Sequence, residues 1–169
     1  MKDIKSKLCF VFFSMAFVNL AFCQELLPEV VVAATRYKYL SAVDNKEIEQ
    51  PVKLLERKAA EFNVKNSDFY DDEYDEYYIS FYIPQGYILA NYNKDGKLMH
   101  TAEKYKNVAL PSKVAQALVK QYPQWAIPKD VYLVTYQQEK GATKIWKILL
   151  INGNNRLRIK VNENGEIIN

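Results

Sequence analysis

The chain has 169 residues, with 23 Lys and Arg, 20 Asp and Glu, and a single histidine. This near balance of charge gives no net field suited to a nucleic-acid partner, so none is expected. With one histidine and five glycines, the sequence also excludes a zinc motif with paired histidines and a glycine-rich phosphate loop. No cofactor is expected.

Residues 1–23 have the pattern of a signal peptide. Three lysines precede an apolar stretch, Leu8–Phe22, which is too short for a comfortable membrane span and suits a signal-peptide core. Ala21 and Cys23 are small and predict cleavage before Gln24. The alternative is a lipoprotein signal with the lipid on Cys23, against which Phe22 argues because that position normally holds a small residue. We therefore expect export to the periplasm or the cell exterior.

Both cysteines of the chain, Cys9 and Cys23, lie in this predicted signal segment. The remaining 146 residues carry 20 basic and 19 acidic side chains and contain no further long apolar run. The exported chain is therefore expected to have no stable membrane span, no disulfide and no thiolate metal site. An ordinary hydrophobic core must hold it together.

Residues 24–46 are predicted to form an extended N-terminal arm. Within it, Leu27–Tyr37 reads LPEVVVAATRY, which favours an extended arm or a first strand. This stretch resembles the TonB-box segment of outer-membrane receptors, which binds its partner by adding a strand. No receptor barrel follows it in the sequence, so the extended arm remains the main interpretation.

Two segments 60 residues apart share one helical pattern. Pro51–Phe62 and Pro111–Tyr122 each begin with proline, which the first helical position tolerates. Leu55, Ala59 and Phe62 fall on one face of a helix. Pro123 ends the second segment because a residue before proline avoids helical angles. The sequence therefore predicts two amphipathic helices in equivalent positions.

Strands and tight turns follow both helices. The segments EYYISFYI, VYLVTY and RLRIKV are predicted strands, and the second has apolar residues on both faces. Asn93–Gly96 and Asn162–Gly165, 69 positions apart, are predicted hairpin turns. The nine extra residues of the second half are placed around Gln137–Thr143. The prediction is an α+β fold of two tandem helix-plus-antiparallel-sheet repeats, residues 47–106 and 107–169, with the helices packed on one face of the sheet.

These motifs resemble the PepSY-like secreted proteins, a family with a fold similar to that of the β-lactamase inhibitory protein. The similarity rests on the helix start Leu110-Pro111, the helix end Tyr122-Pro123 and the closing turn Asn164-Gly165. It covers approximately Ile48–Asn169. The resemblance implies a fold and an export route, and it implies no established chemistry.

Few residues indicate catalysis or metal binding. The single histidine, His100, is expected on a strand surface. Asn91, Asn93 and Asp95 have the spacing of a calcium loop, but Ala102 occupies the position that needs a carboxylate. The acidic run DFYDDEYDEYY, residues 68–78, is interpreted as a solvated loop, with a recognition patch as the alternative.

The function predicted from these features is that of an exported, non-enzymatic binding module with an envelope or extracellular protein partner. A sheet face rich in aromatic residues is expected to recognise a protein or peptide. Its predicted binding residues are Tyr78, Tyr82, Tyr132, Tyr136 and Trp146. One alternative is a small-ligand carrier. The other is a hydrolase that uses two of the carboxylates Asp71, Asp72, Asp75 and Glu76.

Overall fold

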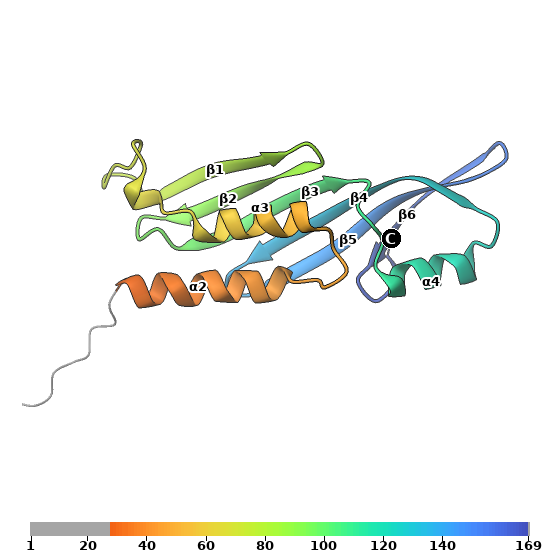
Figure 1. Cartoon of the computed structure of the whole chain (residues 1–169), viewed down its shortest axis with the longest axis horizontal. Helices are drawn as coiled ribbons and strands as arrows, with labels where there is room; N and C mark the ends of the chain where they lie inside the picture. Colours follow the sequence, from red (N-terminus) through yellow and green to blue (C-terminus); the bar gives the residue numbers. More distant parts are fainter. Residues whose placement is uncertain (1–27, 169) are drawn as a thin grey trace, which may run out of the picture.

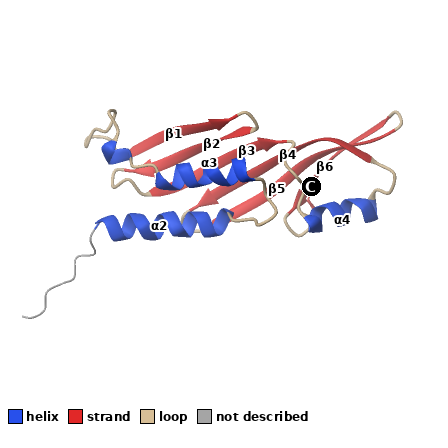
Figure 2. Cartoon of the chain, viewed as in Figure 1, coloured by secondary structure: helices blue, strands red, loops and turns tan. Residues whose placement is uncertain are grey.

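The computed structural model describes residues 28–168, with side chains from residue 34 onward. The predicted signal segment, the cleavage site and residues 24–27 lie outside this range. The described part is an α+β fold, which confirms the class expected from the sequence. Its strands form one antiparallel sheet of seven strands, whose order in space follows the order in the chain (Figure 2).

The elements run in chain order from a helical N-terminal part to a strand-rich C-terminal part (Figure 1). They are α2 (Pro28–Val43), α3 (Gln50–Glu61), the short 3-10 helix η2 (Val64–Asn66), β1 (Glu76–Ile83), β2 (Gly86–Asn93), β3 (Leu98–Lys106), α4 (Ser112–Gln121), β4 (Ala126–Gln137), β5 (Gly141–Asn152), β6 (Asn155–Asn162) and β7 (Ile167–Ile168). Among the described helices, none is long and apolar enough to cross a membrane.

Helix α2 replaces the extended arm predicted for residues 24–46, so that prediction is wrong over Pro28–Val43. Thr35, Tyr39 and Val43 are buried at intervals of four residues, which places them on one helical face. This face contacts α3 and strands β3, β4 and β5. The packing of this face therefore overrides the weak helical preference of the β-branched residues in the segment.

The two predicted amphipathic helices are confirmed as α3 and α4. Helix α3 has Pro51 in its first turn and buries Val52, Leu55 and Ala59. It contacts β1, β2 and α2, and it lies beside α2 in Figure 1. Helix α4 buries Val114 and Leu118 and ends just before Tyr122, as the proline that follows requires.

Both predicted hairpin turns are confirmed, and they have the same hydrogen bonds. In the first, the Asn93 Oδ1 atom accepts from the backbone N–H groups of Asp95 and Lys97. In the second, Asn162 Oδ1 accepts from residues 164 and 166 in the same way. Gly96 and Gly165 have φ angles of 78° and 83°, a left-handed conformation that glycine adopts without strain.

Gly86 is a position where strands β2 and β3 approach each other closely. A Cβ atom at this position would lie 2.0 Å from the carbonyl oxygen of Lys104 on β3, and a backbone atom cannot move aside cheaply. We therefore expect Gly86→Ala to lower the free energy of unfolding by about 3 kcal/mol. Urea denaturation measures this change.

Gly153→Ala is the matched control. Gly153 also has a positive φ, 57°, but a Cβ atom at this position would have no atom within 4 Å, so the cost is about 1 kcal/mol from backbone strain alone. Equal losses of stability in the two variants would contradict the close approach of β2 and β3.

Candidate binding surface on the open face of the sheet

One face of the sheet carries a row of stacked aromatic rings across strands β3, β4 and β5, and these strands contact α2. Tyr105 on β3 pairs with Tyr132 on β4, and Tyr132 pairs with Trp146 on β5. The ring centroids are 6.0 Å apart in the first pair and 4.4 Å apart in the second. All three side chains are fully buried.

This arrangement divides the five predicted binding residues between the two faces. Tyr132, Tyr136 and Trp146 are fully buried in the core, whereas Tyr78 and Tyr82 on β1 are 77% and 69% exposed. The single exposed aromatic face predicted from the sequence is therefore not formed. The physical reason is that β4 and β5 have apolar residues at both odd and even positions, so alternation alone does not identify their buried side.

The opposite face, here called the open face, is basic over strands β3 to β6. Strand register places one row of side chains across it, from Lys106 through Val131 and Lys147 to Lys160. A neighbouring row joins Lys129, Leu149 and Arg158. The lysines and the arginine of these rows are exposed, and the two apolar residues are half-buried.

Lys147 and Lys160 lie directly opposite each other on β5 and β6. Like charges in this position repel and destabilise a sheet. Within the described residues the one ion pair joins Lys144 to Glu163 at 3.7 Å, so no carboxylate of the described chain neutralises this pair. The protein therefore keeps a repulsive pair of cations on an exposed surface.

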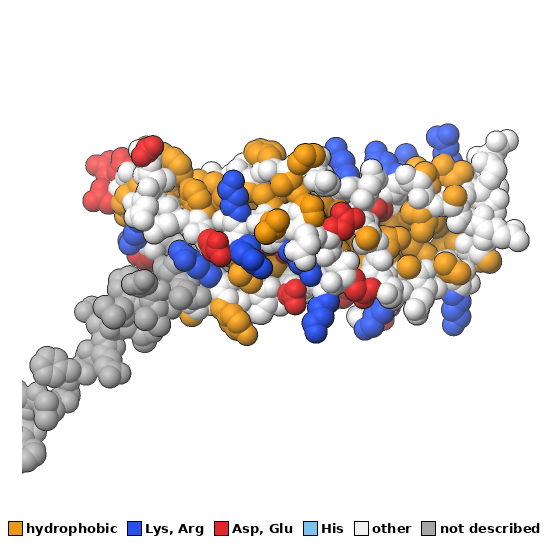
Figure 3. All heavy atoms as spheres, in the orientation of Figure 1, with side chains coloured by type: hydrophobic (Ala, Val, Ile, Leu, Met, Phe, Trp, Pro, Cys, Tyr) orange, Lys and Arg blue, Asp and Glu red, His pale blue; other side chains and the backbone are white. Residues whose placement is uncertain are grey.

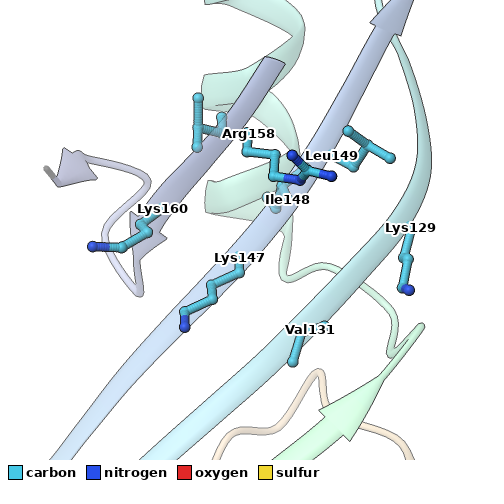
Figure 4. Close-up of a pocket in the computed structure, with 8 residues that line it drawn as sticks. Lys129, Val131, Lys147, Ile148, Leu149, Arg158 and Lys160 are labelled. Carbon is cyan, nitrogen blue, oxygen red and sulfur yellow. The ribbon is translucent and has the colours of Figure 1, made fainter. Parts of the chain in front are cut away.

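A shallow groove of about 460 Å³ lies among these basic residues. Val131 and Leu149 contribute apolar surface, and the basic residues around them are Lys129, Lys147, Arg158 and Lys160. Figure 4 shows these side chains on strands β4, β5 and β6, with α4 behind them. A groove with apolar surface and a cationic rim suits a ligand that combines negative charge with an apolar group.

A second cluster of polar residues lies buried between the sheet and α2. The Glu103 carboxyl on β3 accepts hydrogen bonds from Tyr39, Thr101 and Tyr105, each at 2.8 Å. Burial raises the pKa of Glu103, and the three hydroxyl donors and the Lys144 ammonium act against this rise. Tyr39 therefore connects α2 to the sheet through a carboxyl group in the core.

Lys144 is the buried cation of this cluster. It lies on β5, on the same core side of the sheet as Glu103 and the aromatic row, and it donates to the Asp44 carbonyl at 3.0 Å. A polar interface of this kind contributes less stability than apolar packing would. It does give α2 a defined position, because Tyr39 must meet one particular carboxyl.

Glu56 on α3 is the other buried carboxyl. Burial, together with the nearby Glu103 carboxyl, raises the pKa of Glu56 to about 9, and Lys144 partly opposes the shift. Its Oε1 atom has no hydrogen-bond partner among the described residues. Glu56 is therefore protonated in the folded protein at neutral pH.

These two carboxyls do not form an accessible acid-base pair. Glu56 and Glu103 are only 4% and 3% exposed. The carboxylates considered for a hydrolase, Asp71, Asp72, Asp75 and Glu76, are instead exposed and do not line the groove. Over the described residues, no group of three or more His, Cys, Asp or Glu side chains could hold a metal ion. The groove on the open face is therefore the stronger candidate site.

Comparisons of the chain with protein-family models, with curated proteins and with solved structures find no match. The class that the described residues define is an α+β protein with a single antiparallel sheet and a basic open face.

The sequence contains a signal for this surface that strand pairing makes visible. The alternation of Arg156, Arg158 and Lys160 on β6 predicts one basic side for that strand, as the structure has it. Whether Lys129 and Lys147 join this basic surface depends on the register between β4, β5 and β6. That register is a property of the folded sheet and is not readable from any one strand.

The protonated state of Glu56 predicts a dependence of stability on pH. Its pKa is raised to about 9 in the folded protein and lies near 4.3 in an unfolded chain. The folded state therefore binds more protons between these values, and its free energy of unfolding falls as the pH rises. This group contributes a slope of about 1.4 kcal/mol per pH unit between the two pKa values. Its stabilising contribution is complete below the unfolded pKa and is lost as the pH rises through the folded pKa.

Glu56→Gln tests this expectation because glutamine has a similar shape and does not titrate. We expect the variant to be more stable than the original chain at pH 8 and to lose less stability between pH 5 and pH 8. Urea denaturation at several pH values measures both. Exposed Glu61→Gln is the control and should leave the slope unchanged. A variant with the original slope would contradict the buried protonated carboxyl.

Lys160→Glu tests the repulsion on the open face. It converts the like-charged pair with Lys147 into an opposite-charged pair across the strands. We expect the free energy of unfolding to rise by about 0.5 kcal/mol in low salt, and by less in 1 M salt. Exposed Lys120→Glu on α4 is the control with the same change in net charge. Equal effects of both substitutions would refute local repulsion.

Proposed function

We propose that this chain is an exported, non-enzymatic binding module that recognises an acidic segment of a protein or peptide through the open face of its sheet. The observation that carries the proposal is the unneutralised pair Lys147 and Lys160 beside the groove. A protein gains no stability from such a pair, so an anionic occupant gives it a use.

The extent of the cationic surface favours an extended partner. Basic residues continue beyond the groove onto β3. Lys106 lies opposite Val131, and Lys104 lies opposite Leu133 on the same face of the sheet. Tyr82 and Tyr87 follow on β1 and β2, with ring centroids 6.1 Å apart. A peptide lying across the strands would meet several cations, apolar surface and two aromatic rings. Tyr82 thus keeps a role in the proposed surface.

Two further parts of the proposal concern origin and location. The apolar Leu8–Phe22 stretch after three lysines supports export to the periplasm or the cell exterior.

Matching helix starts and matching turns support descent from a PepSY-like ancestor with two tandem repeats and helices packed on one sheet face. Strands β2 and β6 begin 69 positions apart, and strands β3 and β7 also begin 69 positions apart. The second half then has one additional strand, β4.

A carrier of small anionic ligands is the second candidate. The groove volume of about 460 Å³ falls in the range of small-molecule sites, and the four cations around it would bind a carboxylate or phosphate. Because the groove is shallow and the basic surface extends past it, the peptide-binding proposal accounts for more of the structure.

Peptide binding tests the proposed function. The probe is a fluorescent peptide of unrelated sequence that contains several Asp and Glu residues and one Tyr. We expect Lys147→Gln with Arg158→Gln to weaken its binding by about tenfold, as the loss of two charge contacts predicts. Binding should also weaken strongly from 50 mM to 1 M salt. Fluorescence anisotropy measures the dissociation constant.

The matched control removes two exposed lysines elsewhere, by Lys58→Gln with Lys120→Gln. It has the same net charge as the groove variant, so equal weakening by both would show binding through net charge alone and would contradict the proposed site. A small anion that binds tightly while the peptide does not would select the carrier instead.

A further inference from the structure

We propose that the groove on the open face binds the acidic loop, residues 67–75, of a second copy of this chain. Copies of the protein would then associate head to tail. This inference rests on the proposed function, because it names the acidic segment that the open face recognises. It goes beyond that function by making the binding module its own partner.

The acidic loop has the chemistry that the groove suits. All of its acidic residues are exposed, and none forms an ion pair with a described residue. They are Asp68, Asp71, Asp72, Glu73 and Asp75. Two rings stand among them, Phe69 and Tyr74, which are 52% and 58% exposed. Carboxylates can therefore meet the basic rim while a ring covers Val131 and Leu149.

Internal hydrogen bonds hold the loop in one shape. The Asp71 carbonyl accepts from the Tyr77 hydroxyl and from the backbone N–H of Tyr74. Asp71 Oδ1 accepts from the backbone N–H of Glu73 at 3.0 Å. The Lys94 N–H donates to the Asp75 carbonyl at 2.9 Å. A loop that is already ordered loses less conformational entropy on binding, which favours association.

The loop cannot reach the groove of its own copy. It precedes β1 at one edge of the sheet, whereas the groove lies on β4, β5 and β6. Four strand spacings separate β1 from β5, a distance of about 19 Å. Figure 3 shows a group of Asp and Glu side chains at one end of the molecule, with acidic and basic side chains intermingled over the rest of the visible face. Neutralisation of the acidic loop by the basic groove therefore requires a second molecule.

The contact joins two different surfaces, so each copy keeps one free loop and one free groove. Such heterologous contacts form rings when the rotation closes and open chains when it does not. In either case the assembly grows with protein concentration and weakens as salt screens the charges.

Sedimentation velocity on the exported chain tests self-association. We expect the weight-average sedimentation coefficient to rise with concentration in 20 mM salt and to return to the monomer value in 1 M salt. A chain that stays monomeric in low salt at concentrations up to about 1 mM overturns the inference.

Two variants assign the contact to its surfaces. Asp72→Asn with Glu73→Gln removes loop charges and keeps the Asp71 hydrogen bonds. Lys147→Gln with Arg158→Gln removes groove charges. Each pair should weaken self-association by about tenfold, in line with the loss of two exposed charge contacts. Glu61→Gln with Glu139→Gln, and Lys58→Gln with Lys120→Gln, are the charge-matched controls and should leave self-association unchanged.

Mixing the loop variant with the groove variant gives the decisive result. One retains an intact groove and the other an intact loop, so a mixture should form a one-to-one complex that cannot grow further. Labelling one variant identifies this complex by its sedimentation. A mixture that stays monomeric, at concentrations where the original chain associates, overturns the proposed contact.

The same variants separate this inference from the proposed function. If the acidic probe peptide binds the groove but self-association does not depend on the loop, the second copy is the wrong occupant and the binding function stands. If the peptide does not bind the groove and self-association does not depend on the loop, both proposals fail.

Discussion

The stacking of Tyr105, Tyr132 and Trp146 determines which side of the sheet faces the helices. These three rings form one continuous buried row across β3, β4 and β5. Side chains alternate along a strand, so their neighbours Val131 and Lys147 must point to the other face. A slip of one residue between β4 and β5 would bury lysine and expose tryptophan. The basic open face is thus a consequence of the aromatic core.

The sequence predicts the parts of this fold that depend on local chemistry. The helices at Pro51 and Pro111 and the turns at Gly96 and Gly165 follow from proline, helical periodicity and left-handed glycine. Helix α2 is not predicted, because the helical face formed by Thr35, Tyr39 and Val43 gains its stability from contacts with distant strands. Local preference in this segment favours extended structure.

The candidate site is less predictable than the fold for a related reason. Tyr132, Tyr136 and Trp146 lie in strands that are apolar on both faces, so their burial depends on how β4 pairs with β3 and β5 and is not readable from their own pattern. Burial of Glu56 is likewise hidden, since glutamate is normally exposed. Alternating basic residues on β6 are readable, but their assembly with Lys147 into one surface requires the register between strands.

The charge distribution of the chain is informative although its net charge is small. A composition with nearly equal numbers of acidic and basic residues excludes a uniformly charged protein, but it does not exclude two separated regions of opposite sign. Here the acidic residues cluster before β1 and the basic residues cluster on β3 to β6, at different parts of one sheet. Salt screens charges beyond a short distance, so each region acts through its local charge and not through the net charge of the protein. Each can therefore bind a complementary surface, and the spacing of the strands prevents them from neutralising each other within one molecule.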